Sequence, residues 1–127
     1  MLGKTSLARL KGVHADLVHV VKHANQLANE KGYDFRVHEG LRTIETQREY
    51  VKRGASRTLN SRHLTGHAID FVPLVGGKDN WKWPAFWPIV ECFERAAYEL
   101  GVEIECGARW KSFPDGAHVE LSRKVYP

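Results

Sequence analysis

The sequence predicts an α+β fold, a small single domain in which a short antiparallel sheet is flanked by helices. Its 127 residues are 43% hydrophobic and 27% charged, which suits one globular unit with one core. Segments with helical periodicity alternate with short segments of alternating polarity, most of them a hairpin's distance apart. The chain has no internal repeat, low-complexity segment or linker, so we expect residues 1–127 to form one domain.

The first third of the chain predicts a helix followed by a strand. Residues 13–32 are amphipathic, because Leu17 and Val21 begin a stripe of apolar side chains at helical spacing. Gly32 is a typical C-terminal stop for this helix. Residues 33–39 alternate in polarity and are rich in aromatic and β-branched side chains, which favours a strand.

The next segment predicts a second helix and a loop. Thr43 can cap a helix that runs to about Lys52, and Gly54 can end it. Residues 55–66 are polar and rich in turn-forming side chains, which indicates a loop.

Two prolines restrict a third helix, expected within residues 81–101. The segment becomes helical after Pro84, and its regular part is expected to start near Pro88, because proline fits only within the first turn. The remaining elements are shorter: strands over residues 67–73 (ended by Pro73), 102–106 and 118–122, a turn over 74–80 and a loop over 107–116.

The net charge of +4 and the pI of about 9.2 favour anionic partners such as nucleic acid, phospholipid head groups or bacterial cell-wall polymers. A charge that serves solubility explains the same values. The sequence contains no recognisable reading helix or base-stacking sheet, so we expect no nucleic-acid partner. The N-terminal segment lacks a continuous apolar stretch, and nothing approaches the roughly 20 apolar residues of a membrane span, so we expect no signal peptide.

The two cysteines, Cys92 and Cys106, have neither the paired spacing of a zinc ribbon nor the number needed for a disulfide framework. Cys92 lies among apolar residues of an expected helix, so we expect a buried free thiol there. A single bridge between the two cysteines is an alternative that the sequence leaves open.

The segment SRHLTGHAID, residues 61–70, concentrates groups that can bind a metal ion. A catalytic zinc site needs three protein ligands and an open position for water, and His63, Asp70 and His118 could supply the ligands. Gly66 allows the chain to reverse between the first histidine and the aspartate. His118 begins a strand that could lie beside the strand of Asp70, which would bring the three side chains together.

Asp115 stands three residues before His118, in the run PDGAH. In a zinc peptidase a carboxylate beside the metal takes a proton from the attacking water and passes it to the leaving amine. Asp115 could have this role. The alternative is that Asp115 only forms a β-turn with its proline and glycine neighbours.

These segments resemble a known family. SRHLTGHAID resembles the S-x-H-x-x-G-x-A-x-D signature of the zinc D,D- and L,D-peptidases related to VanX and VanY, and PDGAH resembles their second signature. EGLRTIETQREYVKRGAS, residues 39–56, is similar to the arginine-bearing segment of this family. In length and layout the chain most resembles the phage endolysins that act as L-alanyl-D-glutamate endopeptidases. The resemblance covers nearly the whole chain and implies the fold shared by hedgehog domains and D,D-peptidases.

The resemblance also implies roles for individual residues. One zinc ion per chain would be held by His63, Asp70 and His118. Asp115 would be the general base and acid, and Arg42 would stabilise the oxyanion formed when water attacks the amide carbonyl.

Ser61 would position the substrate or the metal ligands. The proposed base is an aspartate, whereas the corresponding motif of the VanX-type carboxypeptidases is Glu-x-x-His. The shorter acid agrees with the phage endopeptidase branch. A surface arginine in a helix-entry loop is the alternative for Arg42.

The resemblance implies hydrolysis of the L-Ala–D-Glu bond of peptidoglycan during host cell lysis. We expect a monomer without a separate cell-wall-binding domain, whose charge could also attract anionic outer-membrane or wall polymers. It would be made in the host cytoplasm and reach the periplasm and cell wall after holin-type permeabilisation. The alternatives are a D-alanyl-D-alanine carboxypeptidase or dipeptidase and a non-catalytic, zinc-stabilised binding module.

Other histidines and an aromatic cluster are further candidates for the site. His67 could compete as a ligand, but on a strand its side chain and that of Asp70 would point to opposite faces. His19 and His23 reproduce only half of the HExxH zinc motif. An aromatic cluster is expected to pack in the core and anchor a helix, with sugar or peptide stacking as the alternative: Trp81, Trp83, Phe86 and Trp87.

Overall fold

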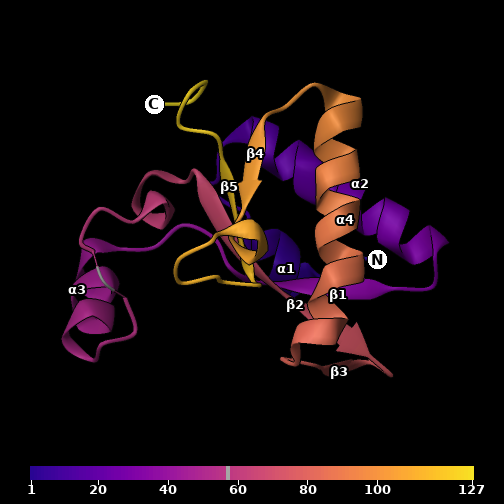
Figure 1. Ribbon diagram of the computed structural model, residues 1–127, viewed down its shortest axis with the longest axis horizontal. Coiled ribbons are helices and arrows are strands. Elements are labelled where there is room, and N and C mark those ends of the chain that lie inside the picture. The colour runs from indigo at the N-terminus through magenta and orange to yellow at the C-terminus, as the bar shows by residue number, and fades with distance from the viewer. Residues whose placement is uncertain (57) are drawn as a thin grey trace.

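Four α-helices and an antiparallel sheet of five strands make up the described part of the chain, residues 1–56 and 58–127 of a computed structural model, and confirm the α+β prediction (Figure 1). The helices are α1 (Lys4–Arg9), α2 (Ala15–Glu30), α3 (Ile44–Lys52) and α4 (Trp83–Leu100), with 3₁₀ turns η1 (Arg62–Thr65) and η2 (Gly107–Arg109). The strands are β1 (Asp34–Glu39), β2 (Ala68–Val75), β3 (Lys78–Asp79), β4 (Ile104–Cys106) and β5 (His118–Leu121). They are ordered β1-β2-β5-β4, and β3 extends β2 as a short hairpin.

The core lies between the sheet and two helices, α2 and α4, which pack against each other (Figure 1). Three buried phenylalanines join these layers: Phe35 of β1, Phe71 of β2 and Phe93 of α4. Their ring centroids are 5.0 to 5.6 Å apart in tilted and edge-on pairs, the geometry that aromatic rings prefer. In Figure 1, α3 stands at the side of the molecule away from this core.

Most expected elements are confirmed, with shifts of one or two residues at their ends. Thr43 caps α3 as predicted, because its Oγ1 accepts a hydrogen bond from the Thr46 N–H at 3.1 Å. The expected loop over residues 55–66 contains η1, and its residue 57 lies outside the described residues. The expected helix over 13–32 and the strands over 33–39, 102–106 and 118–122 are present as α2, β1, β4 and β5.

The predicted start of the third helix is wrong, because α4 begins at Trp83 and contains Pro88 in its interior. A proline there removes one hydrogen bond, the one to the carbonyl of Pro84, and interior proline costs about 3 kcal/mol. The same turns bury Phe86 and Ile89 completely or nearly so. The apolar surface that these side chains remove from water offsets the proline, so the helix continues through it.

The predicted end of the second strand is also wrong, because β2 runs through Pro73 to Val75. The Pro73 carbonyl accepts a hydrogen bond from the Asn80 N–H at 2.9 Å, so the backbone nitrogen and carbonyl of Pro73 both face the side of β3. The missing proline N–H therefore faces the weakly paired side of the strand, where proline is tolerated. The expected turn is present, since Gly76 and Gly77 both have positive φ angles (60° and 79°) between β2 and β3.

The first helix, α1, was not predicted from the sequence. It is a short helix with no side-chain N-cap, and its hydrogen bonds to β1 connect it to the sheet. Ser6 Oγ accepts from the Val37 N–H at 3.0 Å, and Arg9 donates to the Val37 carbonyl at 3.0 Å. Such long-range contacts leave no local sequence signal.

Cys92 and Cys106 are buried and free, which confirms the expected thiol and answers the question of a bridge between them. Burial raises the pKa of the Cys106 thiol to about 12, so the thiol is protonated at neutral pH. Among the described residues, no helix has the length and apolar content needed to cross a bilayer.

Substitution of Phe93 by alanine should destabilise the protein by about 3–5 kcal/mol, because it empties the centre of the phenylalanine cluster. Urea unfolding followed by far-UV circular dichroism measures this change. Tyr98→Ala is the matched control on the same helix, since Tyr98 is 79% exposed. An equal loss of stability in both variants would contradict the assignment of the core.

Candidate active site

The fold brings the three predicted ligands together at one end of the sheet. Asp70 and His118 face each other across the β2–β5 pair, so their side chains project from the same face. His63 comes from η1, and Gly66 then turns the chain back into β2 with a positive φ of 75°. A Cβ atom on Gly66 would lie 2.4 Å from the Gly12 carbonyl oxygen, so only glycine fits at this reversal.

The ligand atoms converge on one carboxylate oxygen. Asp70 Oδ1 lies 3.3 Å from His63 Nε2 and 3.4 Å from His118 Nδ1, and the three ligand atoms are all within 4.8 Å of one another. Asp70 Oδ1 is buried and, among the described residues, has no hydrogen-bond partner. A cation between the three side chains would satisfy it. Two imidazole nitrogens and a carboxylate oxygen suit zinc and leave a fourth position for water.

Each histidine is oriented by a partner behind it. The Nδ1 atom of His63 lies 2.8 Å from the Gly40 carbonyl oxygen, and Nε2 of His118 lies 2.8 Å from Glu120 Oε1. The two rings therefore present opposite nitrogens to Asp70. Such partners fix the tautomer and ring orientation of metal-binding histidines. Neither Gly40 nor Glu120 was predicted, although Glu120 lies two residues from His118 and shares its side of the strand.

The charges of this cluster are strongly coupled. Burial would raise the pKa of Asp70, but the His118 and His63 imidazoles outweigh it and hold that pKa well below its usual range. Burial alone would lower the pKa of His118, but the adjacent carboxylates of Asp70 and Glu120 raise it to about 9. A metal ion must therefore displace a proton from His118 at neutral pH.

Asp115 lies beside the ligands without joining them. Its peptide N–H donates to the Gly107 carbonyl at 3.0 Å, and its Oδ1 accepts from the Ala117 N–H at 3.2 Å. The turn expected as an alternative role is thus real, and it directs the carboxylate into the cleft that holds the ligands. Partial burial in this cleft, and then the nearby Asp70 carboxylate, raise the pKa of Asp115. A raised pKa suits a group that accepts and returns a proton.

Arg42 is fixed in the wall of the same cleft, and its side chain is only 8% exposed. It donates to the Glu39 carboxylate and, at 2.6 Å, to Gln47 Oε1. Its guanidinium lies over the Tyr50 ring, 4.6 Å from the centroid, and 3.7 Å from Asp70 Oδ2. The alternative of a surface arginine is therefore wrong, and no sequence pattern indicated the side chains that hold Arg42.

Ser61 connects the arginine to the ligand loop. Its Oγ accepts from the His63 N–H at 3.2 Å and lies 3.4 Å from Arg42 Nη1. The serine thus caps η1 and orders the first ligand. Its expected contact with substrate stays a prediction.

The remaining histidines lie outside this cluster. The His67 ring packs 5.6 Å from that of His14, and its Nδ1 lies 2.7 Å from Thr65 Oγ1. His23 binds Glu99 at 2.7 Å. Within the described chain, the three predicted ligands form the one group of side chains arranged to hold a metal.

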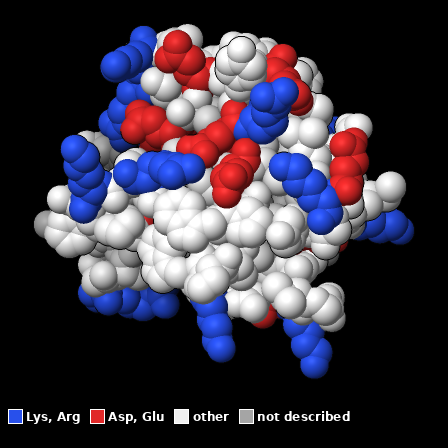
Figure 2. Space-filling model, turned by 45° about the vertical axis from the view of Figure 1, so that its right-hand side comes forward, with Lys and Arg blue, Asp and Glu red and all other residues white. Residues whose placement is uncertain are grey.

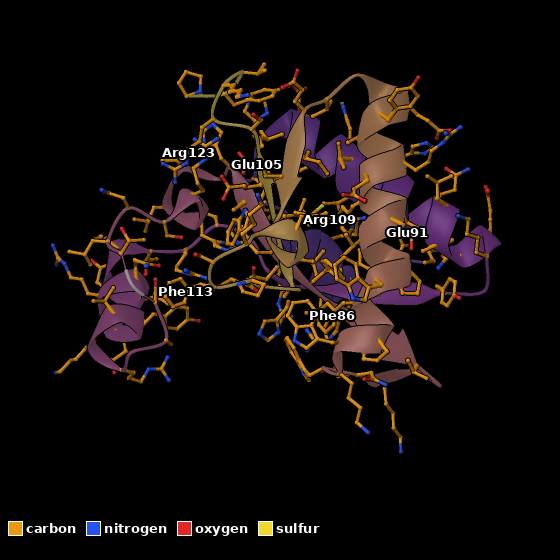
Figure 3. The ribbon with its side chains drawn as sticks, viewed as in Figure 1. Phe86, Glu91, Glu105, Arg109, Phe113 and Arg123 are labelled. Atoms are coloured by element: carbon orange, nitrogen blue, oxygen red, sulfur yellow. The ribbon has the colours of Figure 1, made fainter. Side chains whose placement is uncertain are left out.

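The ligands, Asp115 and Arg42 line one cleft of about 370 Å³. The cleft lies between α3, which contributes Tyr50, and the loop before β5, which contributes Trp110. In Figure 3, Phe113 marks this loop, Arg123 lies above it beyond β5, and Phe86 lies below it at the start of α4.

Comparisons with known proteins agree with this geometry. The sequence model of a family described as phage L-alanyl-D-glutamate peptidase matches residues 1–126. The L-alanyl-D-glutamate peptidase of Escherichia phage T5 is 36% identical over 128 residues, covering 98% of this chain and 90% of the relative. That of Listeria phage A118 is 34% identical over 100 residues, covering 78% of this chain and 34% of the relative. The crystal structure of the Serratia marcescens L-Ala D-Glu endopeptidase ChiX aligns with a TM-score of 0.92 and 41% identity, covering 100% of this chain and 94% of that structure.

Substitution of Glu120 by glutamine should weaken zinc binding by about 10- to 100-fold, because the charged partner of His118 is lost while the side-chain volume is kept. Competition with a chromophoric chelator measures the affinity. Glu91→Gln, the same change at an exposed position of α4 outside the cleft, should bind zinc as the unaltered protein does. An unchanged affinity in the Glu120 variant would show that this carboxylate does not orient the ligand.

Proposed function

The chain belongs to the phage L-alanyl-D-glutamate peptidase family, and from this premise we propose that it is a zinc endopeptidase that cuts between L-Ala and D-Glu in bacterial peptidoglycan. The observation that supports the proposal is the convergence of His63, Asp70 and His118 beside Asp115 and Arg42 in one cleft. A phage enzyme of this specificity would serve host cell lysis. The carboxypeptidase and binding-module alternatives gain no support from the relatives.

The chemistry divides between the ion and the side chains. Zinc, when bound by the two histidines and Asp70, acts as a Lewis acid that acidifies water and polarises the scissile carbonyl. Asp115 accepts a proton from the water that attacks the L-Ala carbonyl carbon. It then gives this proton to the D-Glu nitrogen as the C–N bond breaks, which leaves a new carboxylate on L-Ala and a new amino group on D-Glu.

Arg42 is suited to the charge that develops on the carbonyl oxygen. Its guanidinium is held in place by Glu39 and Gln47 before any substrate binds, so little reorganisation is needed in the transition state. Ser61 keeps the arginine next to the ligand loop. The same arginine is close to Asp70, one of the proposed metal ligands, which supports this role.

The proposal also covers where the protein acts. The relatives from phages T5 and A118 are named as peptidases of the same bond, so the wall of an infected bacterium is the proposed substrate in the cell. Release through a holin-type lesion, a monomeric state, a single catalytic domain over residues 1–127 and attraction to anionic wall or outer-membrane polymers stay predictions.

Purified Gram-negative peptidoglycan should release fragments with new amino groups on D-Glu when treated with this protein. A chelator should abolish the release, and added zinc should restore it, because the metal supplies the Lewis acid. Mass spectrometry of labelled amino termini identifies the bond. Release of D-Ala alone, or cleavage indifferent to metal removal, would refute the proposal.

Replacement of Asp115 by asparagine should lower kcat by about 10²- to 10⁴-fold while zinc affinity stays within a few-fold, because the proton acceptor is lost and the ligands are kept. Asp79→Asn, a change outside the cleft, is the matched control. A loss of zinc affinity together with activity would instead show that Asp115 belongs to the metal site. Full activity in the Asp115 variant would exclude it as the base.

A further inference from the structure

An aromatic groove of about 350 Å³ opens beside the catalytic cleft. It is lined by Trp81, Trp83 and Phe86 and by the turn residues 114–117, so the groove and the cleft share Asp115. We infer that this groove binds a sugar ring of the glycan strand next to the scissile bond. The inference rests on the proposed function and extends it from the peptide to the glycan.

Two of the three rings that line the groove, Trp81 and Trp83, are exposed to solvent. Phe86 is 4% exposed and belongs to the core, as the sequence predicted for the cluster. Trp81 and Trp83 are 52% and 44% exposed, so core packing does not account for them. Figure 2 shows a band of uncharged residues across the middle of one face, below a region where both signs of charge mix. Exposed aromatic side chains that line one groove, as Trp81 and Trp83 do, mark binding sites.

The arrangement of the rings suits a flat, weakly polar ligand. The centroid of Phe86 lies 6.1 Å from that of Trp81 and 6.5 Å from that of Trp83, and both pairs are tilted. The faces of aromatic rings carry negative potential, which attracts the C–H edges of a pyranose. Trp81 also meets His38 at 5.1 Å, and His38 lines the catalytic cleft, so the two hollows are continuous on this side as well.

The charge of the groove favours a neutral sugar over the carboxylates of the stem peptide. Asp115 is the one charged residue among those lining the groove, and it would repel a carboxylate. On the amine side of the scissile bond the stem continues with D-Glu and its free carboxylate. On the carbonyl side only L-Ala and the lactyl group separate the bond from the sugar ring. A neutral sugar therefore suits the groove, and the carboxylates suit the part of the cleft lined by Arg62 and Arg123.

A structural role for the rings has to be separated from sugar binding. A Cβ atom on Gly116 would lie 3.3 Å from both Trp83 and Phe86, so these two rings pack against the turn that carries Asp115. Trp81 is not among the nearest neighbours of that position. It is therefore the residue whose removal tests the groove with the least disturbance of the turn.

The experiment compares two substrates that differ only in the group on the L-Ala amine, which is either a lactyl-linked disaccharide or an acetyl group. One is a disaccharide-linked stem peptide, and the other is the same peptide with its L-Ala amine acetylated, so that both lack an amino-terminal charge. Trp81→Ala should lose about 3- to 10-fold more kcat/KM on the sugar-bearing substrate than on the acetylated one, mainly through KM. Trp81→Phe should recover part of the loss. Tyr98→Ala, on the distant part of α4, is the control.

Binding gives a second measurement that does not depend on cleavage. In the Asp115→Asn background, calorimetry should show that the sugar-bearing peptide binds more tightly than the acetylated peptide and that Trp81→Ala removes most of this difference. An equal effect of Trp81→Ala on both ligands, or no effect on either, would overturn the sugar site. Failure of the unaltered protein to cut either substrate between L-Ala and D-Glu would instead refute the proposed function. The binding comparison would still show whether the groove binds the sugar.

Discussion

The Asp70 carboxylate, enclosed by two imidazoles, is the constraint on which the site depends. Its Oδ1 atom is buried without a hydrogen bond from the described residues, and a buried carboxylate of this kind needs positive charge nearby. His118, whose pKa is raised, provides that charge in the metal-free protein, and a divalent ion would provide it when bound. The same three side chains thus balance the charge in this corner of the sheet and form the group that could hold a metal ion.

A chain of paired charges extends from this carboxylate to the end of the sheet. His118 connects Asp70 to Glu120, and Glu120 lies 3.7 Å from the guanidinium groups of Arg62 and Arg123. Arg62 also donates to the Leu121 and Tyr126 carbonyls. The residues that follow β5 are thereby fixed against the strand of His118, so we expect substitutions there to affect the proposed metal site through the orientation of one imidazole.

The sequence predicted what depends on local pattern and missed what depends on distant contacts. The spacing in residues 61–70 and 115–118 was enough to select side chains that the fold brings together, because the β2–β5 register follows from two short strands. Pro73 and Pro88 were misjudged because tertiary burial and strand edges decide whether proline is tolerated. Gly40 and Glu120 were missed because a hydrogen-bond partner of a ligand leaves no motif.

The two cysteines have a consequence for a protein that is proposed to leave the compartment in which it is made. Both thiols are buried, and burial keeps Cys106 in its unreactive, protonated form. Oxidants and disulfide-exchange catalysts act on accessible thiolates, so neither position offers them a starting point. Passage from a reducing to an oxidising environment would therefore leave the covalent structure of the enzyme unchanged.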